Sequence, residues 1–97
     1  MNKFYVTKEI AEKLRGKCYP QVRYYGNRDE FIIPRIDEVL AWLRDENKIQ
    51  VSPWYHRIKN QWTCTVNYDN GVYNSVFYLK YEDSALDGIE YVLDYLI

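Results

Sequence analysis

The sequence predicts an α+β protein in which helices cover one face of a three-stranded antiparallel sheet. Amphipathic helical patterns at residues 34–48 and 81–97 bracket a stretch in which polar and apolar residues alternate, as they do in strands. A turn signal, DNG at residues 69–71, divides this stretch, and consecutive antiparallel strands form a meander. We therefore expect a two-layer sandwich, an antiparallel meander packed by helices, in the order helix, short hairpin, helix, three strands, helix.

A chain of 97 residues has the size of one domain, so we expect residues 1–97 to share a single core. Residues 1–33 would add an N-terminal helix and a hairpin or loop to the core at 34–97. In VTKEIAEKLRGK, Thr7 can cap a helix because its hydroxyl accepts a backbone N–H, and Gly16 can end it. The runs QVRYY and EFII around GNRD predict a hairpin, and an ordered loop fits the same residues.

The second helix is expected to start at or just after Pro34, whose missing N–H is harmless in a first turn. Its apolar residues recur at the spacing of one helical face: Ile36, Val39, Leu40 and Leu43. This single stripe predicts a helix that buries one side.

Three strands are expected to follow. The first starts at KIQV and meets Pro53, which cannot donate to a ladder, so we place it at an edge or a bulge. The next two form a hairpin, with alternation from Trp62 to Tyr68 and again from Val72 to Leu79. In the DNG turn between them, Asn and Gly accept the positive φ of a tight turn. Bulky residues occur on both sides of these strands, so the pattern leaves the inward face open.

The last helix, YEDSALDGIEYVLDYLI, is predicted to anchor the core while its acids face solvent. Its apolar stripe consists of Leu86, Ile89, Leu93 and Leu96, widened by Ala85 and Val92. Gly88 is costly within a helix, which indicates the close approach of a bulky neighbour such as a sheet Trp or Tyr. Asp83, Asp87 and Glu90 share a face without a histidine, so we expect a solvated surface rather than a metal site.

Charge is divided unevenly along the chain, although the formal net charge is −1. Residues 1–35 carry eight Lys or Arg against four Asp or Glu, whereas residues 81–97 carry five acids and no base. We expect these ends to neutralise each other within the fold or to associate head to tail, rather than to form a nucleic-acid patch.

The two cysteines, Cys18 and Cys64, lie far apart without a CxxC motif, so no zinc framework is indicated, and the one possible bridge is a weak disulfide signal. Cys64 alternates with strand residues and is predicted to be a buried, reduced thiol. The start, MNKFYVTKEI, lacks the apolar stretch of a secretion signal, and no apolar run is long enough to span a membrane. We therefore expect a cytoplasmic protein without cofactor.

The segment PWYHRIKNQW is the best candidate for a binding surface. It combines aromatic rings with cations, and its candidate residues are Trp54, Tyr55, His56, Arg57, Lys59 and Trp62. No Ser or Cys nucleophile can be placed beside His56, the single histidine, so catalysis is not expected. The same mixture suits stacking with single-stranded nucleic acid, and it also suits an edge strand guarded against aggregation.

From residue 34 onward, the layout of helix, three-stranded meander and C-terminal helix resembles the double-stranded RNA-binding domain. That family places lysines at the start of its last helix to grip phosphates. Here KYEDSALDG offers Lys80 followed by Glu82, Asp83 and Asp87, which would repel phosphate. The resemblance therefore implies a topology and not RNA binding.

Over nearly its full length the chain also resembles small uncharacterised proteins of bacterial prophages and mobile elements. The resemblance lies in VTKEIAEKL, IPRIDEVLAWLRDENKIQV and YDNGVYNSVFYLKYEDSALDGIEYVLDYLI. These motifs consist of core and capping residues, so they imply relatives rather than an activity. Lys80 departs from the Ser or Thr common in those proteins and removes the N-cap of a capping box.

Taken together, the sequence favours a non-enzymatic protein-interaction module of phage or mobile-element type. Its partner would be an unknown protein, or a second copy joined through the sheet edge as a homodimer. One alternative is a weak nucleic-acid-binding protein that uses Arg57, Lys59 and the basic first third of the chain. The other is a small inhibitor or antitoxin-like factor.

Overall fold

The computed structural model describes residues 4–17, 19 and 33–97. Its elements are α1 (Lys8–Gly16), α2 (Ile36–Asn47), β1 (Gln50–His56), β2 (Gln61–Tyr68), β3 (Gly71–Asn74), α3 (Tyr81–Tyr91) and a π-helical turn, η1 (Val92–Leu96). This order confirms the predicted α+β fold. The hairpin or loop expected after the first helix falls on residues 20–32, outside the described part of the chain.

The sheet is an antiparallel meander in the order β1-β2-β3. Pro53 of β1 lies opposite Cys64 of β2. The Cys64 carbonyl accepts the Ser75 N–H, so the backbone of Cys64 bonds to the segment after β3 rather than to β1. Because backbone bonds alternate in direction along an antiparallel pair, the backbone of Pro53 faces the free edge. The missing N–H of proline therefore costs no ladder bond, which confirms the edge position predicted for Pro53.

The third strand is shorter than predicted because an extra residue interrupts its pairing. Thr65 pairs with Asn74, and Trp62 then forms a bridge with Tyr78. Three steps along β2 thus correspond to four steps along the neighbouring segment, which is the geometry of a β-bulge. The extra residue reverses the alternation, so Tyr78 joins Tyr73 on the helix-covered side and the alternation predicted through Leu79 fails.

The DNG hairpin turn lies where it was predicted, but its conformation differs. Tyr68 pairs with Gly71, so Asp69 and Asn70 form the two-residue loop. Among the described residues other than glycine, positive φ occurs only at Lys48 and Asn60, and Gly71 is not left-handed either. The prediction of positive φ in this turn is therefore wrong.

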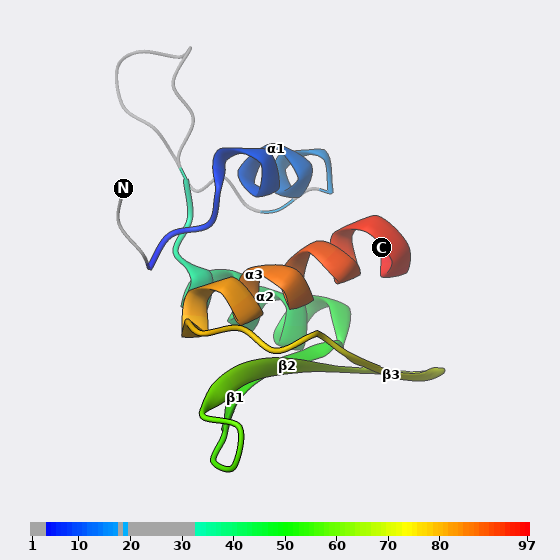
Figure 1. Ribbon diagram of the computed structural model, residues 1–97. Helices are drawn as coiled ribbons and strands as arrows, with labels where there is room; N and C mark the ends of the chain where they lie inside the picture. The colour runs from blue at the N-terminus through cyan, green and yellow to red at the C-terminus, as the bar shows by residue number, and fades with distance from the viewer. Residues whose placement is uncertain (1–3, 18, 20–32) are drawn as a thin grey trace.

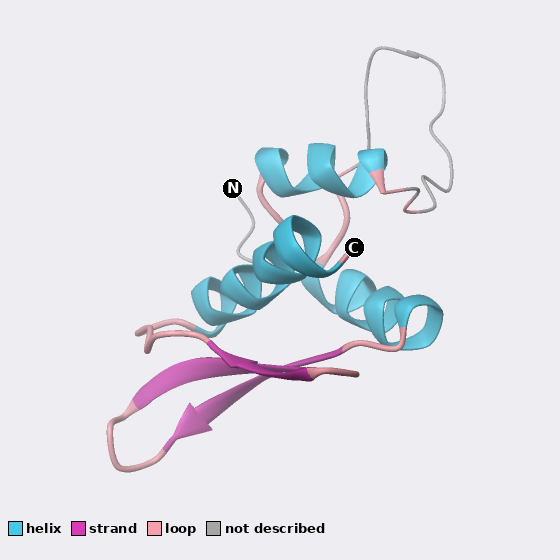
Figure 2. Ribbon diagram, turned by 90° about the vertical axis from the view of Figure 1, so that its right-hand side faces the viewer, coloured by secondary structure: helices cyan, strands magenta, loops and turns pink. Residues whose placement is uncertain are grey.

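Among the described residues, the three helices α1, α2 and α3 lie on one side of the sheet, and no helix covers its other face (Figures 1 and 2). In α2, the predicted stripe is realised by the buried residues Ile36, Val39 and Leu43, with Leu40 half-buried. These residues share one core with Val51, Cys64 and Val66 of the sheet. Figure 1 shows α1 above α3 rather than against the strands, so it covers the outside of the helix layer.

The apolar stripe predicted for the last helix is largely buried across α3 and η1. Ile89 and Leu93 are buried together with Ala85 and Val92, whereas Leu86 and Leu96 are only half-buried. At Gly88, an added Cβ would stand 2.5 Å from the Cys64 sulfur. The helix therefore approaches the sheet closely at this residue. The close approach predicted at Gly88 is confirmed, although the neighbours are Cys64 and Val51 rather than Trp or Tyr.

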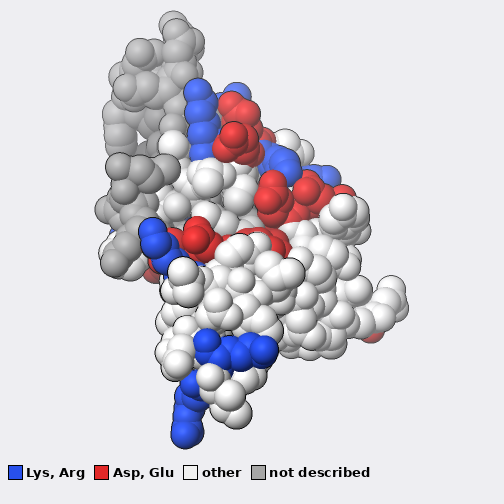
Figure 3. Space-filling view, in the orientation of Figure 1, with Lys and Arg blue, Asp and Glu red and all other residues white. Residues whose placement is uncertain are grey.

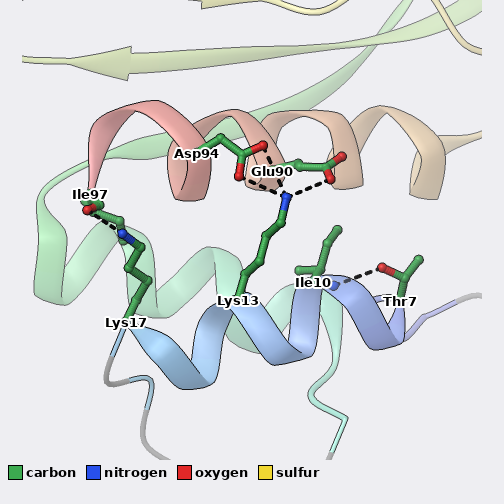
Figure 4. A network of polar contacts seen from close by, with 7 residues as sticks. All are labelled: Thr7, Ile10, Lys13, Lys17, Glu90, Asp94 and Ile97. Carbon is green, nitrogen blue, oxygen red and sulfur yellow. Dashed lines mark hydrogen bonds and ion pairs between the residues drawn. The ribbon is translucent and has the colours of Figure 1, made fainter.

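The oppositely charged ends of the chain meet where α1 lies beside the C-terminal helix (Figure 4). Lys13 Nζ contacts Glu90 Oε2 at 3.1 Å and Asp94 Oδ1 at 2.9 Å, and Lys17 Nζ donates to the Ile97 carbonyl at 2.8 Å. Thr7 caps α1 as predicted, because its hydroxyl accepts the Ile10 N–H at 3.2 Å. The expected neutralisation between the ends is thus present at Lys13.

Candidate functional site

The uncovered face of the sheet carries a row of aromatic side chains. The rings of Trp54 and His56 lie 5.6 Å apart, and those of His56 and Phe77 lie 5.4 Å apart. We call Trp54, His56 and Phe77 the aromatic row. Trp54 and Phe77 are 43% and 37% exposed, so the row presents apolar surface to solvent.

Hydrogen bonds that cross the sheet hold Trp54 in place. Its indole Nε1–H donates to the Thr65 hydroxyl at 2.9 Å, and that hydroxyl donates to Asn74 Oδ1 at 2.8 Å. The chain of bonds runs from β1 through β2 to β3. An exposed indole that is already fixed loses little rotamer freedom on binding, which favours its use as an anchor.

His56 is held by the backbone rather than by a catalytic partner. Its Nδ1 accepts the Lys59 N–H at 3.2 Å, which places the N–H proton of the neutral ring on Nε2. Lys59 Nζ in turn lies 5.1 Å from the centroid of the Phe77 ring, a cation–π contact. These contacts orient the ring of His56 on the open face.

The six residues predicted as a site do not share one face of the sheet. Trp54 and His56 lie on the open face, whereas Tyr55 and Trp62 pair directly across the strands on the helix-covered side, with ring centroids 5.5 Å apart. Arg57 lies in the β1–β2 loop. Residues 54–58 also line an open hollow of about 570 Å³.

Sequence reasoning missed three members of the open face, namely Phe77, Thr65 and Asn74. Phe77 reaches this face only because the bulge before Tyr78 reverses the alternation. A polar residue such as Thr65, two positions from Thr63 in a strand, carries no signal that it orients an indole on the neighbouring strand.

The loop between β1 and β2, residues 57–60, is exposed and basic; we call it the basic loop. Ile58 is 88% exposed, the largest such value among the exposed apolar side chains of the described residues. Neither Arg57 nor Lys59 has an ion-pair partner in the described part of the chain. Figure 3 shows Lys and Arg side chains at this end of the molecule, well away from the Asp and Glu side chains.

A second feature, the acidic groove, lies between α1, α3 and the third strand. It has a volume of about 590 Å³ and is lined by Thr7, Glu9, Ile10, Tyr73, Tyr78, Asp83, Leu86, Asp87, Glu90, Tyr91, Asp94 and Tyr95. Figure 3 shows Asp and Glu side chains gathered in this region.

The sequence predicts that Asp87 lies on a solvated face, and for this residue the prediction is wrong. Its carboxylate accepts hydrogen bonds from Tyr73 at 2.6 Å and from Tyr78 at 2.5 Å. Burial together with this bond raises the pKa of Tyr73 above its usual range, and the bond to Asp87 together with burial raises the pKa of Tyr78 to about 12. Both tyrosines therefore remain neutral donors at physiological pH.

Metal binding and thiol chemistry find little support in residues 4–17, 19 and 33–97. No group of three His, Cys, Asp or Glu side chains there could hold a metal ion. Cys64 is buried as predicted, and desolvation raises the pKa of its thiol to about 12, which disfavours the nucleophilic thiolate. Within the same residues, each helix is too short or too polar to cross a membrane.

Comparisons with protein-family models, with curated proteins and with solved structures yield no match to this chain. The resemblances to prophage proteins and to the double-stranded RNA-binding domain therefore stay predictions, and the geometry of the open face and the groove must carry the functional argument.

Proposed function

We propose that the protein is a non-enzymatic protein-binding module whose partner docks on the open face of the sheet. The observation that carries the proposal is the exposed aromatic row on the face opposite all three helices. A sheet face that packs on nothing usually carries polar residues, and exposed aromatic surface marks an interaction site. Val72, which pairs with Asn67 on the same face and is 55% exposed, adds further exposed apolar surface along the third strand.

The chemistry of the face favours a partner that presents an apolar surface with carboxylates at its rim. Lys59 lies against Phe77 and supplies positive charge at one end of the aromatic row. The strand residues of this face are uncharged, namely Gln50, Ser52, Gln61, Thr63, Thr65, Asn67 and Asn74. An acidic rim on the partner would complement Lys59, while the row would fill an apolar pocket.

Nucleic acid fits the same surface less well. Affinity for nucleic acid depends on several phosphate contacts, and the open face and its loop supply two cations, Arg57 and Lys59. An inhibitor or antitoxin-like role would begin with the same protein-binding step on this face.

The proposal is tested by affinity capture from the native host after nuclease treatment, followed by titration of each purified captured protein. We expect Trp54→Ala to weaken that binding by about 25-fold or more, since a central Trp anchor is worth about 2 kcal/mol or more. Tyr95→Ala is the matched control, because this exposed ring lies in the acidic groove away from the open face.

The proposal fails if nuclease abolishes capture, if Trp54→Ala binds as tightly as the wild type, or if Tyr95→Ala causes the same loss. Circular dichroism of both variants checks that the fold is kept, which the exposure of the two rings leads us to expect.

A further inference from the structure

We propose that copies of this chain associate head to tail, with the basic loop of one copy seated in the acidic groove of the next. The proposal goes beyond the proposed function, because it concerns the loop and the groove rather than the aromatic row. It rests on complementary charge, complementary apolar surface and the separation of the two features within one molecule.

The acidic groove has a surplus of negative charge. It contains five carboxylates, and Lys13 lies between two of them, Glu90 and Asp94. Glu9 and Asp83 are exposed and have no ion-pair partner in the described part of the chain. Cations within the described fold therefore neutralise the groove only in part, and an incoming cation would be attracted to it.

The groove also has aromatic and apolar walls, so it is more than a group of acids. The rings of Tyr73 and Tyr91 are stacked at 3.8 Å, and Tyr95 follows at 5.2 Å from Tyr91. Tyr95 is 74% exposed, and Leu86 and Ile10 line the same hollow. Tyrosine faces bind guanidinium and ammonium groups, and the half-buried Leu86 offers contact to an apolar side chain.

The basic loop carries the matching groups in a fixed shape. Arg57 and Lys59 flank Ile58, so an exposed apolar side chain stands between two cations. The loop is tied down by the Lys59 N–H bond to His56 Nδ1 at 3.2 Å and by the Tyr55 hydroxyl bond to Asn60 Oδ1 at 3.0 Å. A preformed loop loses little entropy on docking, which favours binding.

The loop cannot reach the groove of its own chain. β1 and β2 are paired along their whole length, and the hairpin projects away from α1 and α3 (Figures 1 and 2). A second copy must therefore supply the loop. Because the two contact surfaces differ, an open row of copies has a free loop at one end and a free groove at the other. Further copies can add at both ends, so association gives filaments, or rings where the two ends meet.

The test separates the two halves of the contact. Arg57→Ser with Ile58→Ser removes most of the loop contact and spares Lys59, which lies against Phe77 of the aromatic row. Glu9→Lys with Asp83→Lys reverses the charge at the exposed acids of the groove. Sedimentation at low salt should show that the wild-type mass grows with concentration. Each variant alone should associate at least tenfold more weakly and remain a monomer over the same range.

A mixture of the two variants gives the decisive result. The Glu9→Lys, Asp83→Lys variant keeps its loop, which should enter the unchanged groove of the Arg57→Ser, Ile58→Ser variant. The altered loop and the altered groove that remain free cannot pair with each other. We expect a one-to-one dimer that grows no further and that dissociates as salt is added.

The proposal is overturned if the wild type stays monomeric at low salt, if either variant alone associates like the wild type, or if the mixture stays monomeric or grows beyond a dimer. Since Trp54 is untouched in both variants, such a failure would leave the binding test of the open face unaffected.

Discussion

Tyr78 donates its hydroxyl to Asp87 Oδ2 across 2.5 Å. Tyr73 donates to the other oxygen of the same carboxylate at 2.6 Å, so one residue of α3 accepts two bonds from the segment that contains β3. Hydrogen bonds to a charged acceptor are stronger than neutral ones. The pair therefore fastens α3 to the edge of the sheet at the point where the bulge disrupts the ladder.

Removing this carboxylate should destabilise the fold. Asp87→Ala leaves two half-buried hydroxyls without their acceptor, and we expect a loss of about 1.5–3 kcal/mol in the free energy of unfolding. Urea unfolding followed by circular dichroism measures the loss. Asp83→Ala, an exposed acid on the same helix, should change stability by less than about 0.5 kcal/mol. Equal losses in the two variants would show that the bonds from Tyr73 and Tyr78 to Asp87 do not contribute to the free energy of unfolding.

The same bonds predict a loss of stability at high pH. The pKa of Tyr78 rises from 10.0 to about 12 on folding. A group whose pKa is raised in the folded state stabilises it fully below the unfolded pKa and loses that contribution as pH rises through the folded value. The window for Tyr78 is therefore pH 10 to about 12.

Urea unfolding at several values of pH, with tyrosinate absorbance recorded alongside, measures this window. In Tyr78→Phe, which has no ionisable hydroxyl, the decline in stability across the window should be shallower than in the wild type. A parallel decline in both proteins would mean that Tyr78 does not titrate as its contact with Asp87 requires.

Overpacking at Gly88 should be among the costliest small changes in the chain. An added Cβ would lie 2.5 Å from the Cys64 sulfur and 2.9 Å from Val51 Cγ1, so Gly88→Ala forces α3 away from the sheet. We expect a loss of about 1–3 kcal/mol in the free energy of unfolding, although alanine favours helices. Thermal and urea unfolding measure the loss.

Two controls make the interpretation specific. Gly16→Ala, where an added Cβ meets nothing within 4 Å, should be neutral or stabilising by up to about 1 kcal/mol. Cys64→Ala in the Gly88→Ala background should recover part of the loss, because it removes the nearest clashing atom. If the double variant is destabilised by the sum of the two single changes, the clash with Cys64 is not the cause.

The sequence predicted those structural features that residues one or two helical turns apart determine, such as apolar helix faces and an N-cap. The spacing of Ile36, Val39 and Leu43 places them on one helical face, and all three are buried. Thr7 caps α1, as a hydroxyl before an apolar pattern predicts. Such features follow from local geometry and need no knowledge of what packs against the helix.

The two candidate surfaces could not be predicted, because both depend on one extra residue in the third strand. Strict alternation places Phe77 on the same side as Tyr73 and on the opposite side from Tyr78. The bulge reverses this order, which brings Phe77 to His56 on the open face and Tyr78 to Asp87 on the other. Its position is set by the bridge between Trp62 and Tyr78, a contact between residues distant in sequence.

Burial, rather than charge neutralisation, should hold α1 in place. Leu14 is fully buried, whereas Lys13 and its partner Glu90 have side chains that are 37% and 50% exposed. An exposed ion pair contributes about 0–1 kcal/mol, and a Leu→Ala change in a core costs about 2–5 kcal/mol. We therefore expect Leu14→Ala to destabilise the protein several-fold more than Lys13→Ala in urea unfolding.

Salt distinguishes the two contributions further. At about 1 M salt, screening shortens the range of charge interactions to about 3 Å, so the small loss in Lys13→Ala should shrink toward zero. The loss in Leu14→Ala should persist, because hydrophobic burial does not depend on screening. Hydrogen exchange of the α1 amides should report the same ranking. A larger loss in Lys13→Ala than in Leu14→Ala would mean that the opposite charges of the chain ends, and not the apolar face of α1, fix this helix to the core.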